Sequence, residues 1–73
     1  MQPRKESKKY SDMKLEIASV SSKLSHVYNR VTLLTETLKD NQCGQSSADA
    51  FEAEVMLKNA VRILHDAMLH LPS

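Results

Sequence analysis

The sequence predicts an all-α protein, an antiparallel two-helix hairpin that packs like a coiled coil and is completed by a partner chain or a homodimer. Two long segments carry apolar residues at helical spacing, and a short polar segment containing the only glycine separates them. The only prolines, Pro3 and Pro72, lie near the chain ends. A chain of 73 residues buries only about 60% of the surface of its unfolded form, so a second chain would supplement a marginal core.

Residues 1–10, MQPRKESKKY, are expected to form a flexible basic arm ahead of the hairpin, which takes up residues 11–73. The arm is polar and holds four of the ten basic residues. Its charges suit contact with an anionic partner, but a charged terminal run is more often simply solvated.

The first helix is predicted over about residues 12–40, with Ser11 and Asp12 suited to its amino-terminal cap. From Met13 onward its apolar residues alternate at intervals of four and three, the heptad pattern that helices bury against other helices. We expect this seam to pack within the chain. Its residues are Ile17, Val20, Leu24, Val27, Val31, Leu34 and Leu38.

A loop over about residues 41–47 is expected to join the helices. Asn41 and Gly44 favour the left-handed turn that ends many helices. Ser46, followed three residues later by Asp49, resembles a capping box for the next helix. A connection this short makes the two helices antiparallel neighbours.

The second helix is predicted over about residues 48–71, where Pro72 stops it. Alanines recur every seven residues along it and would let another helix come close, so we expect the first helix to lie near this row. The alanines are Ala53, Ala60 and Ala67.

The second helix also carries more apolar surface than one neighbouring helix can cover. Its apolar arc is about 160° wide, against about 100° for a one-sided amphipathic helix. One edge, either Met56 with Ile63 or Val61 with Met68, then stays in water and marks a protein partner. The alternative is a wider internal core under the folded-back arm, which offers only Tyr10 as a sizeable apolar body. The residues predicted to bind the partner are Met56, Leu57, Ala60, Val61, Ile63, Leu64 and Met68.

Catalysis, cofactor binding and metal binding are not expected. His65 and His70 lie about 140° apart on a helix, so they do not converge on a metal. A single glycine does not make a phosphate-binding loop. Cys43 is the only cysteine, which excludes an internal disulfide and favours a reducing compartment.

Charge and hydropathy further limit the classes of partner and the cellular location that are expected. Ten basic against nine acidic residues speak against nucleic acid as the main partner. No segment approaches the roughly 18 consecutive apolar residues that a membrane span needs, and no secretory signal is visible. A cytoplasmic protein without a small-molecule substrate is expected, and whether it is itself exported stays open.

The segment AFEAEVMLKNAVRILHDAMLHL resembles the second helix of the YscE/PscE family, small cytoplasmic co-chaperones of bacterial type III secretion systems. The resemblance covers the last third of the chain, and the first helix matches only in length and heptad pattern. The family pattern of an acid, a leucine, an alanine and a branched pair before histidine falls on Glu54, Leu57, Ala60, Val61, Ile63, Leu64 and His65.

The resemblance implies a hairpin that does no chemistry and binds a tetratricopeptide-like chaperone, together with which it keeps the needle subunit unpolymerised in the cytoplasm. The basic arm and Cys43 have no counterpart in the family pattern. From the residues alone, a self-associating scaffold, a homodimeric four-helix bundle, fits the heptad seam equally well. A small nucleic-acid-binding hairpin is the third class.

Overall fold

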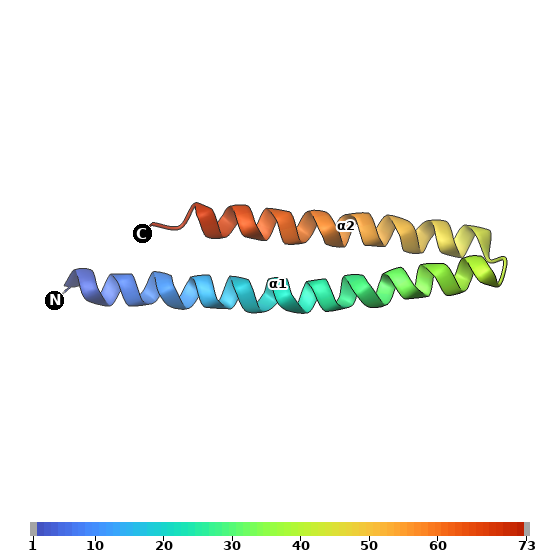
Figure 1. The fold of residues 1–73 in the computed structure, drawn as a ribbon. Helices are drawn as coiled ribbons and strands as arrows, with labels where there is room; N and C mark the ends of the chain where they lie inside the picture. The colour runs from blue at the N-terminus through green and yellow to red at the C-terminus, as the bar shows by residue number, and fades with distance from the viewer. Residues whose placement is uncertain (1, 73) are drawn as a thin grey trace.

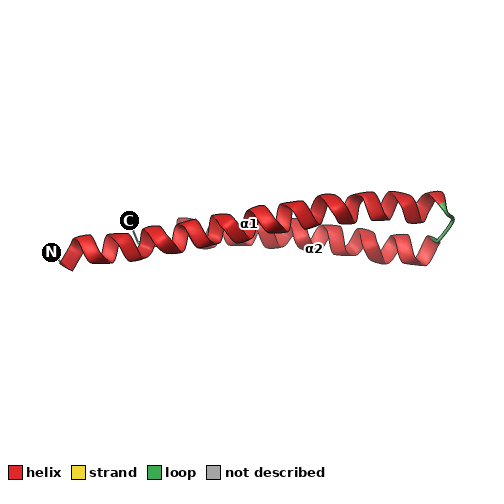
Figure 2. Ribbon diagram, turned by 90° about the horizontal axis from the view of Figure 1, so that it is seen from below, coloured by secondary structure: helices red, strands yellow, loops and turns green. Residues whose placement is uncertain are grey.

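The computed structural model of the chain is a hairpin of two antiparallel helices lying side by side (Figures 1 and 2). It describes residues 2–72, with side chains over residues 9–72. Helix α1 spans Gln2–Asp40 and helix α2 spans Gly44–Leu69. The hairpin extends over 62 × 16 × 10 Å, so it is two helices wide and one helix thick. The predicted all-helical hairpin is confirmed.

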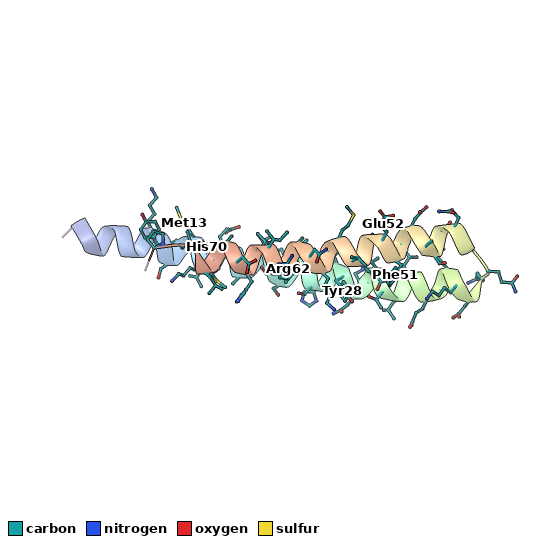
Figure 3. All side chains as sticks on the ribbon, turned by 90° about the horizontal axis from the view of Figure 1, so that it is seen from above. Met13, Tyr28, Phe51, Glu52, Arg62 and His70 are labelled. Atoms are coloured by element: carbon teal, nitrogen blue, oxygen red, sulfur yellow. The ribbon has the colours of Figure 1, made fainter. Side chains whose placement is uncertain are left out.

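Helix α1 begins well before the predicted start near residue 12. The stretch expected to be a flexible arm continues the helix from Gln2, and Met1 lies outside the described residues. The sequence explains this extension, because Gln, Arg, Lys and Glu favour helices and Pro3 is tolerated in a first turn. Helix α1 therefore runs past the end of α2, and Met13 lies at the level of His70 (Figures 1 and 3).

The connection between the helices is shorter than the predicted loop over residues 41–47. Only residues 41–43 separate the helices, because Gly44 already begins α2. The expected capping box does not form, since Ser46 and Asp49 lie inside the helix and its start has no side-chain cap. Instead, the Ser47 hydroxyl donates to the carbonyl oxygen of Gly44 at 2.9 Å.

Helix α1 ends in a Schellman motif, which satisfies its last carbonyl groups. The Cys43 amide donates to the Leu38 carbonyl at 2.9 Å, and the Gln42 amide donates to the Lys39 carbonyl at 3.0 Å. Gln42 takes the left-handed conformation at φ 59°, a role that the sequence had given to Asn41 or Gly44. A side chain other than glycine therefore occupies the most strained position of the turn.

The interface between the helices is thin. No apolar side chain in the described part of the chain reaches full burial, and the buried residues there are the polar Thr35, Ser47 and Glu54. On α1 the less exposed residues again alternate at intervals of three and four, with Thr32 in addition; from Tyr10 to Leu38 they are Tyr10, Lys14, Ile17, Ser21, Leu24, Tyr28, Val31, Thr32, Thr35 and Leu38. On α2 and just beyond its end they are Ser47, Ala50, Ala53, Glu54, Leu57, Ala60, Val61, Leu64, Asp66, Met68 and Leu71.

Candidate functional site: an apolar side of the hairpin

Helix α1 turns a different face toward α2 than its apolar pattern predicted. Four residues of the predicted seam are half-buried against α2: Ile17, Leu24, Val31 and Leu38. The other three, Val20, Val27 and Leu34, are exposed, and Leu34 is 51% exposed. Their places in the interface are taken by Ser21, Tyr28 and Thr35, and Thr35 is only 3% exposed.

The two possible seams of α1 share half of their residues, so the spacing alone did not fix the rotation of the helix. Tyr28, like Tyr10, gives the observed seam a large aromatic side chain. The Thr35 hydroxyl donates to the Val31 carbonyl at 2.9 Å, which satisfies its polar group within the interface. The prediction that Val20, Val27 and Leu34 face α2 is corrected by this rotation.

Helix α2 is rotated in the same sense, toward one of the two edges that the sequence left open. Val61 and Met68 are half-buried toward α1, whereas Met56 and Ile63 are 65% and 56% exposed. Leu57 and Leu64 are also half-buried toward α1. The partner-binding set named from the sequence is therefore divided between the hairpin's own interface and its open surface.

The alanine row of α2 lies at the border of the interface rather than in its middle. Ala53 and Ala60 are half-buried, and Ala67 is exposed. Helix α1 therefore lies near this row at Ala53 and Ala60, as expected, but the seam itself runs through the neighbouring positions Glu54, Val61 and Met68.

A hydrogen bond between the helices marks one long side of the hairpin as polar. The Thr32 hydroxyl lies 3.1 Å from Oε1 of Glu54, a carboxylate that is only 8% exposed, and 3.0 Å from the Tyr28 carbonyl oxygen. Thr32 directly follows the seam residue Val31. Positions that follow the seam in this way share the polar side; Ser25 on α1 and Lys58 and His65 on α2 are polar, whereas Phe51 on α2 is apolar and 56% exposed.

The opposite side of the hairpin carries the more continuous apolar surface, and both helices contribute to it, although Leu15, Leu33, Phe51, Val55 and Leu69 are exposed elsewhere. In an antiparallel helix pair, residues that precede corresponding seam positions of the two helices lie on the same side. On α1 these residues form an outer stripe of Met13, Val20, Val27 and Leu34, and on α2 they are the alanine row. Met56 and Ile63 lie just beyond the alanines. We call the outer stripe, the alanine row and these two residues together the apolar side.

The surface relief of the apolar side follows from residue size. The outer stripe and the pair Met56 and Ile63 have large side chains, and the alanine row between them has small ones, so by side-chain size the row is a trough between two ridges. The stripe itself borders an open hollow of about 370 Å³, lined by Val27, Arg30, Val31 and Leu34. Over residues 9–72, side chains project from the hairpin into the surroundings (Figure 3).

Charged residues of opposite sign border the two edges of the apolar side. Lys23 and Arg30 are exposed beside the outer stripe of α1. Glu52 and Asp66 lie beyond Met56 and Ile63 on α2, and Asp66 faces Arg62 at 3.7 Å in an exposed ion pair. The α1 edge is therefore mainly basic and the α2 edge mainly acidic, although Glu16 also lies on the α1 edge.

The described residues offer little for chemistry. Among them, no three His, Cys, Asp or Glu side chains gather where a metal ion would be held. His26, His65 and His70 are all exposed, and the thiol of Cys43 is free and exposed at the turn. Within the part of the chain that the structure describes, neither helix is long and apolar enough to cross a membrane.

Comparison of the chain with known protein families, with curated proteins and with solved structures gives no match. The apolar side is therefore the feature of the structure that points to a function.

Proposed function

We propose that this chain is a non-enzymatic co-chaperone whose apolar side docks on a larger helical protein. In the setting that the YscE/PscE resemblance implies, this protein is the tetratricopeptide-like chaperone of a type III secretion system, which keeps the needle subunit unpolymerised in the cytoplasm. The observation that carries the proposal is an apolar side built by both helices and covered by neither.

The exposed area of the chain supports a missing partner. The hairpin exposes 5,924 Å². A compact monomer of 8.2 kDa would expose about 4,500 Å², so the excess is about 1,400 Å². A standard protein interface buries about 800 Å² on each partner. The excess reflects the elongated shape of the hairpin as well as its open apolar side, and it is larger than the area that one standard interface buries on a partner.

The shape of the apolar side suits a helical partner. Tetratricopeptide-like arrays stack helix pairs and present extended concave surfaces. A hairpin with a trough between two apolar ridges offers complementary relief to such helices, and Met56 adds a flexible side chain that adapts to its contacts. The supporting features are shape and polarity, and they come from α1 as well as α2.

Co-expression tests this proposal. The candidate chaperone from the same gene cluster should be insoluble or degraded when made alone and soluble when made with this chain, because obligate partners stabilise each other. Val27→Glu combined with Ile63→Glu should abolish the rescue, since both charges would enter the contact. Lys58→Glu, on the polar side, should leave it intact.

The outcome is decisive in both directions. If the double variant remains helical by circular dichroism and fails to rescue, the apolar side is the docking surface. A chaperone that is equally soluble and abundant with and without this chain contradicts the co-chaperone function and favours the self-associating scaffold.

A further inference from the structure

We infer that the free chain pairs with a second copy of itself through the apolar side, forming a four-helix bundle in which both turns lie at the same end. The inference uses the same surface as the proposed function, but it concerns the isolated chain and does not depend on the identity of the larger partner. Three observations support it: the excess area, the relief of the apolar side and the charges along its edges.

The relief of the apolar side is self-complementary when the twofold axis runs along the helices. The Thr32–Glu54 contact sets the register of the hairpin. In that register Val27 lies within about one residue's rise of the level of Ala60, and Val20 has the same relation to Ala67. An axis along the helices preserves these levels while placing α1 of one copy over α2 of the other. Large residues of the outer stripe then meet the alanine row, twice by symmetry.

The edge charges favour the same arrangement. With α1 over the other copy's α2, the basic edge of one copy lies against the acidic edge of the other. Arg30 comes within about one helical turn of the level of Glu52, an offset along the axis that a long side chain can bridge, and Lys23 has the same relation to Asp66, which also pairs with Arg62 of its own chain. Their alkyl stems would cover Met56 and Ile63 while their charged ends stay in water.

The alternative twofold arrangement, with turns at opposite ends, fits less well. It would stack the outer stripe on its own copy, so that Val20, Val27 and Leu34 crowd each other. The alanine rows would also face each other and leave a void, because protein interfaces need close packing. In addition, the acidic edges carrying Glu52 and Asp66 would meet.

A dimer of this kind has a functional consequence. It covers the surface that the larger protein needs, so self-pairing and docking exclude each other. The apparent affinity for the larger protein then falls in proportion to the fraction of chain that is not paired. Self-pairing would hold the free chain in a covered, soluble form until the larger protein displaces the second copy.

The exposed Cys43 allows the relative position of the two turns to be measured without any amino-acid substitution, because it is the only cysteine and lies in the turn. A nitroxide spin label attached there reports the distance between the two turns by pulsed electron paramagnetic resonance. Turns at the same end give roughly 10–25 Å between the two backbones, because neighbouring helices pack about 8–10 Å apart. Turns at opposite ends give roughly 55–60 Å. A single short distance supports the proposal, and a long distance overturns it.

Sedimentation equilibrium on the unlabelled chain tests the pairing itself. We expect a monomer–dimer equilibrium at micromolar concentration, and a monomer at every concentration overturns the inference. Arg30→Glu should raise the dimer Kd about tenfold, because two attractive pairs become repulsive, and Glu52→Arg should act similarly. The combined variant should recover most of the affinity, since the pair is re-formed with reversed signs.

A matched control separates this effect from general charge repulsion. Lys58→Glu makes the same charge change on the polar side and should leave the dimer Kd unchanged. If Lys58→Glu weakens the dimer as much as Arg30→Glu, or if the combined variant is no tighter than the single ones, the proposed charge pairing is wrong. These measurements use the isolated chain, so their failure leaves the co-expression test of the proposed function untouched.

Discussion

Replacing Gln42 by glycine should stabilise the hairpin, and the structure sets the size of the effect. Gln42 is held at φ 59° by the two hydrogen bonds that end α1. The left-handed conformation costs a residue with a side chain about 1–2 kcal/mol. Glycine removes that cost but gives the unfolded chain about 0.4–1 kcal/mol of extra freedom. The net gain should be about 0.5–1 kcal/mol.

Thermal unfolding followed by circular dichroism at fixed protein concentration measures this gain. For a chain of this size, about 0.5–1 kcal/mol corresponds to a rise in Tm of about 3–6 °C. Gln42→Ala should leave Tm almost unchanged, because alanine suffers the same left-handed cost. Ser22→Gly, in the exposed middle of α1, should lower it. If Gln42→Gly lowers Tm, or if Gln42→Ala raises it equally, the turn does not store the strain inferred here.

Three further outcomes follow from the interface and the termini. Glu54→Leu should raise the free energy of unfolding, measured in urea, by about 1–3 kcal/mol, because an apolar side chain replaces a buried carboxylate. Thr32→Val should lower the free energy of unfolding by about 1–2 kcal/mol, because it removes a hydrogen-bond partner of that carboxylate. Val61→Glu should cost more than about 2 kcal/mol in the same assay, while Arg62→Glu, whose ion pair is exposed, should change it by less than about 0.5 kcal/mol. Deleting residues 1–9 should leave the co-expression rescue intact, because the apolar side begins at Met13.

The sequence predicted the helix pairing but not the rotation of the helices. Spacing at three and four identifies a helix with a buried stripe, and that much is confirmed. Ile17, Leu24 and Val31 belong to two overlapping heptad seams, however, and the choice between these seams depends on the partner helix rather than on α1 alone. The more apolar seam is the natural prediction, yet three of its residues, Val20, Val27 and Leu34, face outward.

The predicted helix boundaries differ from the observed ones for a related reason. The polar, charged segment over residues 1–10 has the composition of an arm because Tyr10 is its only sizeable apolar body, although its residue types favour a helix that extends an existing one. The turn was predicted from glycine and asparagine, whereas the hydrogen bonds at the end of α1 place Gln42 in the left-handed position. Local preference was overridden by the geometry of the helix end.

The thin interface of the hairpin also bears on how long the chain survives in a cell. With no fully buried apolar side chain among the described residues, the hairpin has little to resist local opening. Proteases cleave such open forms in proportion to their population when reclosing is fast. Copies in complexes would then persist while surplus copies are removed. Degradation of unbound copies would then keep the amount of this chain close to the amount of the protein that binds it.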